Sequence, residues 1–86
     1  MNEQLEKTVF GDLAQLEKSL AEDSSGDRAR NMLTYFAEVA KAAEAMLDTA
    51  AAGERQLVTQ LIEGFRASQR IVSSVWETLH NASLAV

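Results

Sequence analysis

An 86-residue chain is long enough for one small domain and no more. The absence of cysteine excludes disulfides and thiol chemistry, and a net charge of −5 makes the chain a poor ligand for the phosphate backbone of nucleic acids. No segment reaches the roughly 18 apolar residues of a membrane span, and residues 1–5 lack the basic and apolar regions of a signal peptide. We therefore expect no nucleic-acid partner, no membrane span, and a cytoplasmic location unless a partner exports the protein.

The composition predicts an all-α protein. Good helix formers dominate, there is no proline, and no β-branched run alternates with period two. We expect a single domain over residues 1–86, an antiparallel helical hairpin of two long helices preceded by a shorter N-terminal helix.

The N-terminal segment, residues 1–23, is predicted to form a helix from about Glu3 to Ala21, with Asn2 as its N-cap. Its apolar residues make one narrow stripe: Leu5, Val9, Leu13, Leu16 and Leu20. The polar stretch that ends at Gly26 is the clearest break in the chain, because glycine accepts a positive φ there. Asp27 or Ser25 is a suitable cap for the helix that follows.

The second helix is predicted over residues 27–52, where the apolar pattern is the most regular in the chain. Its apolar residues recur at intervals of three and four: Ala29, Met32, Leu33, Phe36, Val39, Ala40, Ala43, Met46, Leu47 and Ala50. Gly53 follows this pattern as a helix-ending glycine would. The third helix, residues 54–82, should then return antiparallel to the second, and one bent helix through Gly53 is the alternative.

The third helix carries an apolar face that covers roughly half of its circumference, whereas an ordinary amphipathic helix needs little more than 100°. Leu57, Ile71 and Val75 lie on one flank of this face, and Val58, Ile62 and Trp76 lie on the other. One antiparallel neighbour covers only part of such a face. We expect the flank with Trp76 to bind another chain, and the first helix folding back over it is the alternative. The candidate partner-binding residues are Val58, Ile62, Phe65, Val72, Trp76 and Leu79, with Leu13, Leu16 and Leu20 as a second patch.

No residues predict chemistry. His80 is the only histidine, and its place near a helix C-terminus fits a solvated or dipole-stabilised side chain better than a metal ligand. Helix-spaced carboxylates such as Glu44 and Asp48 are expected to be solvated. We therefore predict no catalytic, cofactor-binding or metal-binding residue, no cofactor, and no enzyme activity.

Three stretches resemble the small needle-subunit co-chaperones of bacterial type III secretion systems, the YscE/EscE/SsaE-like family. Residues 13–20, LAQLEKSL, are similar to the family's opening, Gly53 with Gln56 to its turn, and residues 79–84, LHNASL, to the ending of one branch. The chain departs from the family in having Leu57 after Gln56, where members often have tyrosine, and residues 1–12 lie outside the resemblance. The secreted hairpins with a Trp-x-Gly turn are a poorer match, because here the turn is Ala52-Gly53-Glu54.

The resemblance implies a co-chaperone in the bacterial cytoplasm. Such a protein pairs with a tetratricopeptide-like chaperone, and together they keep the needle subunit unpolymerised before export. The alternatives are a self-associating helical bundle, a homodimer with a structural or regulatory role, and another class of secretion chaperone.

Overall fold

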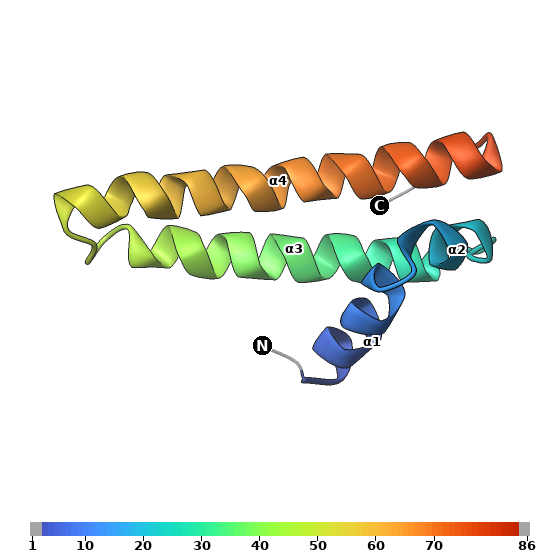
Figure 1. Cartoon of the computed structure of the whole chain (residues 1–86), viewed down its shortest axis with the longest axis horizontal. Coiled ribbons are helices and arrows are strands. Elements are labelled where there is room, and N and C mark those ends of the chain that lie inside the picture. The colour runs from blue at the N-terminus through green and yellow to red at the C-terminus, as the bar shows by residue number, and fades with distance from the viewer. Residues whose placement is uncertain (1–2, 85–86) are drawn as a thin grey trace.

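The computed structural model describes residues 3–84 and confirms the all-α hairpin preceded by shorter helical structure. It contains α1 (Glu3–Leu13), α2 (Leu16–Ala21), α3 (Asp27–Met46) and α4 (Ala52–His80). α3 and α4 run antiparallel along the length of the molecule, and α1 and α2 lie against one end of this hairpin (Figure 1). The proposed N-cap, Asn2, lies outside the described residues.

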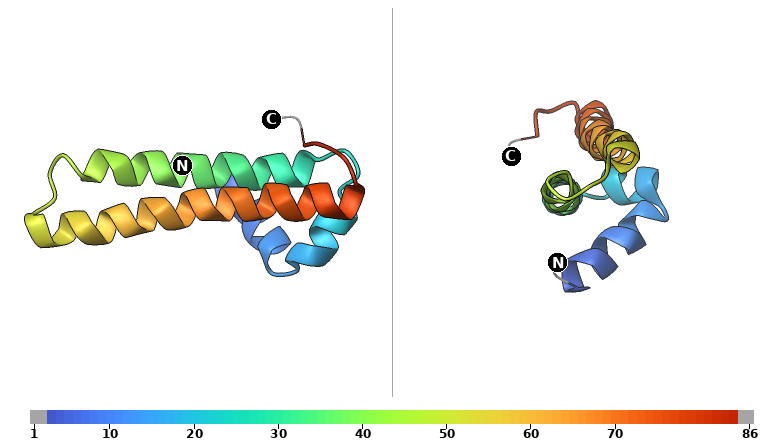
Figure 2. Two further views of the ribbon diagram at one scale, coloured as in Figure 1. Left: turned by 90° about the horizontal axis from the view of Figure 1, so that it is seen from above. Right: turned by 90° about the vertical axis from the view of Figure 1, so that its left-hand side faces the viewer.

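The molecule is elongated. Its Cα radius of gyration is 14.3 Å and its principal extents are 44 × 25 × 21 Å, whereas a compact domain of this length would have a radius of gyration of about 12 Å. Figure 2 shows the reason: α2 lies beside only the carboxyl-terminal part of α4, and α1 projects from the hairpin. Much of α4 therefore has a single neighbour, α3.

The predicted N-terminal helix is broken in two. α1 ends with a tightened turn in which the Gln15 amide donates to the Asp12 carbonyl at 3.2 Å, and Gln15 leaves the helical region at φ −137° and ψ 56°. The break redirects the chain, so that α1 packs on α3 and α2 packs on α4.

An aromatic contact joins α1 to α3. The ring of Phe10, on α1, packs edge-to-face against the ring of Tyr35, on α3, with the ring centroids 5.5 Å apart. Burial raises the pKa of Tyr35 above its usual value, and the nearby carboxylate of Glu6 raises it further by a smaller amount.

Two predicted boundaries of the long helices are wrong. α3 ends at Met46 rather than at residue 52, because the Leu47 amide bonds the Glu44 carbonyl and tightens the last turn. Gly53 is not a helix-ending glycine but lies in the first turn of α4, which begins at Ala52. The two long helices remain separate, joined by residues 47–51, so the single bent helix is excluded.

The largest buried cluster sits at the end of the hairpin that α2 covers. Its fully enclosed members are Val9 from α1, Leu20 from α2, and Ala29 and Met32 from α3, and Val72 and Trp76 from α4 close the cluster. Toward the connection at residues 47–51 the buried side chains are small: Val39, Ala40, Ala43 and Val58. The hairpin is thus packed more heavily at one end than at the other.

Candidate protein-binding surface

The side chains predicted to bind a partner are divided between the interior and the surface. Val58, Val72 and Trp76 are buried in the chain's own core, with Trp76 only 5% exposed. Ile62 and Phe65 of α4 are half-buried. Leu20 is fully enclosed, and Leu13 is half-buried against the main cluster. Leu16 is half-buried and Leu79 is exposed.

The expectation that the flank containing Trp76 is free is therefore wrong, because the chain's own helices bury Val58 and Trp76, and α2 and the turn after it pack over Trp76. The indole Nε1 of Trp76 donates to the carbonyl oxygen of Asp23 at 2.8 Å. The imidazole of His80 stacks on the Trp76 ring, with the ring centroids 4.5 Å apart. The Nε2 atom of His80 lies 2.6 Å from the carbonyl oxygen of Leu20. The rival expectation, that the N-terminal segment folds back over this flank, is what the structure shows. His80 accordingly takes part in this contact instead of being solvated.

The opposite flank of α4 is the one left uncovered. Large apolar side chains there are between 42% and 60% exposed: Leu57, Leu61, Ile71 and Leu79. Together with Gly64, Ser68 and the half-buried Val75 they form a continuous strip, which we call the outer face of α4. Single exposed leucines are ordinary on a protein surface, but a contiguous apolar strip marks an interaction site.

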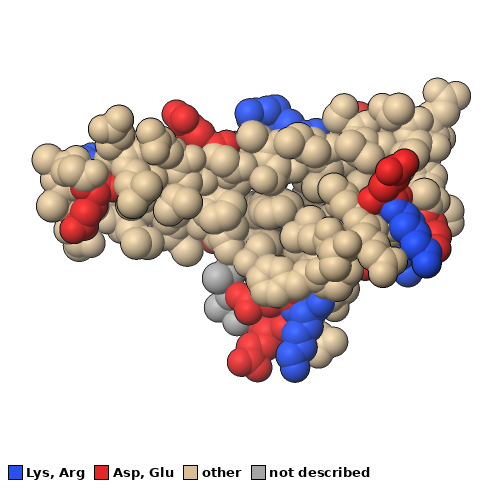
Figure 3. All heavy atoms as spheres, in the orientation of Figure 1, with Lys and Arg blue, Asp and Glu red and all other residues tan. Residues whose placement is uncertain are grey.

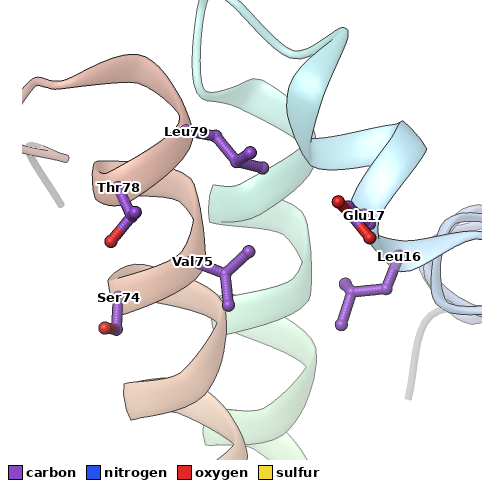
Figure 4. A pocket seen from close by; sticks show the side chains of 6 residues that line it. All are labelled: Leu16, Glu17, Ser74, Val75, Thr78 and Leu79. Carbon is purple, nitrogen blue, oxygen red and sulfur yellow. The ribbon is translucent and has the colours of Figure 1, made fainter.

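The outer face ends in a groove between α4 and α2. The groove has a volume of about 460 Å³ and is lined by Leu16, Glu17, Ser74, Val75, Thr78 and Leu79. Val75 and Leu79 of α4 face Leu16 and Glu17 of α2 across it (Figure 4). Leu16 is therefore the residue of the predicted second patch that reaches this surface.

On the side of the molecule that Figure 3 shows, charged side chains gather on α1, at the ends of the hairpin and along its upper edge. The ion pair of Arg66 with Glu44, at 3.2 Å, links α4 to α3 on the side away from the outer face. None of the seven residues of the outer face is charged, so the surface suits an apolar partner better than an ionic one.

Sequence reasoning placed Leu57, Ile71 and Val75 on one flank but did not select them as binding residues. A signal was available in the spacing. Leu57, Leu61, Gly64, Ser68, Ile71 and Val75 are separated alternately by four and three residues, the interval of a coiled-coil seam. The buried indole of Trp76 also needs a hydrogen-bond acceptor, which a partner's apolar surface does not supply.

Among residues 3–84, no group of three or more His, Cys, Asp or Glu side chains is placed to hold a metal ion. No helix in that part of the chain has the length and apolarity to cross a membrane.

The fold and this surface define a small helical protein whose candidate site is an apolar helix face for binding other proteins. The family model described as "Type III secretion system regulatory protein HrpD6" matches residues 2–78. The chain belongs to this family. No curated protein and no solved structure matches the chain. The predicted link to type III secretion is confirmed, whereas the specific likeness to needle-subunit co-chaperones stays a prediction.

Proposed function

We propose that this protein is a non-enzymatic co-chaperone of the type III secretion system. In this role it pairs with a tetratricopeptide-like chaperone, and the pair keeps the needle subunit unpolymerised in the bacterial cytoplasm before export. The observation that carries the proposal is the outer face of α4, a long apolar strip with no covering element within residues 3–84. Membership of a type III secretion family supports the cellular setting.

The geometry suits such a partner. Helical-repeat proteins stack helix pairs into an extended concave surface, and an amphipathic helix binds in an apolar groove through residues on one face. α4 has 29 residues, and Leu57, Leu61, Ile71 and Leu79 project from one side of it. A chaperone that received this face would bury apolar surface on both proteins and would stabilise both by mass action.

Co-expression with the chaperone and the needle subunit of the same secretion system tests the proposal. Wild-type protein should co-purify with both, and Leu57→Asp should abolish co-purification, because it puts a charge into the buried contact. Thr59→Asp, which adds the same charge at an exposed position off the outer face, is the matched control. The proposal is wrong if the wild type binds neither protein, or if Leu57→Asp and Thr59→Asp co-purify with them equally.

The second candidate is a regulatory protein of the secretion system that acts by self-association. The observation in its favour is the description of the family as regulatory. Loss of a secretion-gene response in a deletion strain, with needle-subunit stability unchanged, would favour this function over the co-chaperone.

A further inference from the structure

The outer face of α4 has the pattern of a helix-pairing seam. Its residues alternate at intervals of four and three from Leu57 to Val75, which is the spacing that two helices crossing at about 20° present to each other. Gly64 and Ser68 occupy the middle of the seam, and no side chain lies within 4 Å of a Cβ placed on Gly64. The centre of the seam is therefore low and open, and a second helix can approach it closely.

The two halves of the seam are complementary in shape. Leu57 and Leu61, on the amino-terminal half, are 60% and 49% exposed, and α2 lies beside only the carboxyl-terminal part of α4 (Figure 2). The carboxyl-terminal half opens into the groove walled by Leu16, Val75 and Leu79. One face thus carries both an apolar protrusion and an apolar groove, about 27 Å apart at 1.5 Å per residue.

We propose that a second copy of this chain covers the outer face, with the two α4 helices packed antiparallel about a two-fold axis at the level of Arg66. In this register Leu57 of one copy lies opposite Val75 of the other, Leu61 opposite Ile71, and Gly64 opposite Ser68. Large residues then meet large ones toward the ends, and small residues meet at the centre. Leu57 of each copy enters the groove between α2 and α4 of the other, where Val75 lies, so the contact is made twice, as a self-complementary two-fold interface requires.

The area available sets the strength of the association. The outer face carries only four large exposed apolar side chains, whereas a standard interface buries about 800 Å² per partner. With the groove walls and the polar edge included, the pair lies at the small end of specific interfaces. The dimer should therefore dissociate on dilution. The inference concerns the isolated protein and does not rest on the proposed co-chaperone role; a chaperone that bound the outer face would have to displace the second copy.

Sedimentation velocity of the full chain over a concentration series tests the dimer. The wild type should pass from monomer to dimer, and Leu61→Asp should raise the dissociation constant by at least about tenfold. Thr59→Asp, which adds a charge to α4 off the seam, should change it by less than about twofold. Circular dichroism shows whether both variants keep their helices. A wild type that stays monomeric throughout, or a helical Leu61→Asp protein that dimerises like the wild type, overturns the proposal.

Disulfide crosslinking tests the register, because the chain has no cysteine of its own. With oxidised glutathione, Ala67→Cys beside the two-fold axis should crosslink alone. A mixture of Gln60→Cys and Ser74→Cys proteins should crosslink to each other, and each alone should not. Crosslinking of Gln60→Cys alone and of Ser74→Cys alone would overturn the antiparallel arrangement. Failure of all these variants to crosslink would overturn the use of this face.

Discussion

The indole Nε1 of Trp76 donates a hydrogen bond of 2.8 Å to the carbonyl oxygen of Asp23, which lies 53 positions earlier in the chain. The carboxylate of the same aspartate accepts from the amides of Arg28 at 3.1 Å and Ala29 at 2.9 Å, at the start of α3. Asp23 therefore joins α3 to the carboxyl-terminal part of α4 from the turn after α2. The contact determines which flank of α4 is covered, and so which flank is available to a partner.

Trp76→Phe should destabilise the protein although it keeps an aromatic ring. The substitution leaves the Asp23 carbonyl without its donor in a buried place, which costs about 1–3 kcal/mol of unfolding free energy. Urea unfolding followed by circular dichroism should show a lower midpoint with an unchanged slope. Thr59→Ala, an exposed change on α4, is the control, and an equal midpoint for the two variants would contradict the role of the indole.

Asp23→Ala should lower stability through loss of the cap on α3. Removal of a capping side chain costs about 0.5–2 kcal/mol, and a loss of 1 kcal/mol lowers the melting temperature of a domain of this size by about 4–8 °C. Asp23→Asn retains one oxygen acceptor and should lose less. The exposed Asp48 supplies the control variant, Asp48→Ala, and a melting temperature equal to that control would show that the cap contributes nothing.

Two glycine substitutions should change stability in opposite directions. Gly26 has φ 83°, and an added Cβ would lie 2.8 Å from Cδ1 of Leu84. Gly26→Ala should therefore cost about 1–2 kcal/mol. Gly53 lies in α4 with nothing within 4 Å of its Cβ position, so Gly53→Ala should stabilise by about 0.5–1 kcal/mol. Urea midpoints measure both, and a Gly26→Ala protein as stable as the wild type would contradict the packing at the turn.

A pair of methionines separates the core from the surface. Met32 is completely buried and Met46 is 57% exposed, and both belong to α3. Met32→Ala should cost about 2–5 kcal/mol, and Met46→Ala should change stability by less than about 0.5 kcal/mol. Thermal unfolding of both variants checks the difference. Equal losses would mean that the end of α3 near residues 47–51 is packed as tightly as the end under α2.

The hairpin was predictable because its apolar spacing is regular. Val39, Ala40 and Ala43 of α3 and Val58 and Val72 of α4 repeat at helical intervals, and these residues are buried as the pattern indicates. The boundaries were less predictable. The tract Ala50–Ala52 suits helix or turn, and Gly53 is tolerated in the first turn of α4, so local preference did not locate the end of α3.

The candidate site was only partly predictable, for a reason that lies in α2. The width of the apolar face on α4 was visible in the sequence, but the covered flank depends on where α2 packs. That depends on the break at Ala14–Gln15, where neither glycine nor proline marks a turn. Sequence reasoning therefore chose Trp76 and Val58 for a partner, whereas the tertiary contact buries them and leaves Leu57 and Leu61 outside.

The two ends of the hairpin differ in how tightly they are packed, and this difference has a consequence for binding. Hydrogen bonds of Trp76, Asp23 and His80 stabilise the end under α2. The other end is packed by small side chains such as Ala40 and Ala43. Fluctuations that open a protein locally begin where few apolar contacts resist them. Leu57 and Leu61 lie at this less tightly packed end. A partner that binds them would also reduce the motion of this part of α4, and the entropy cost of that ordering would lower its net binding free energy. The amino-terminal end of α4 would thus bind the partner, while the carboxyl-terminal end, under α2, is held rigidly.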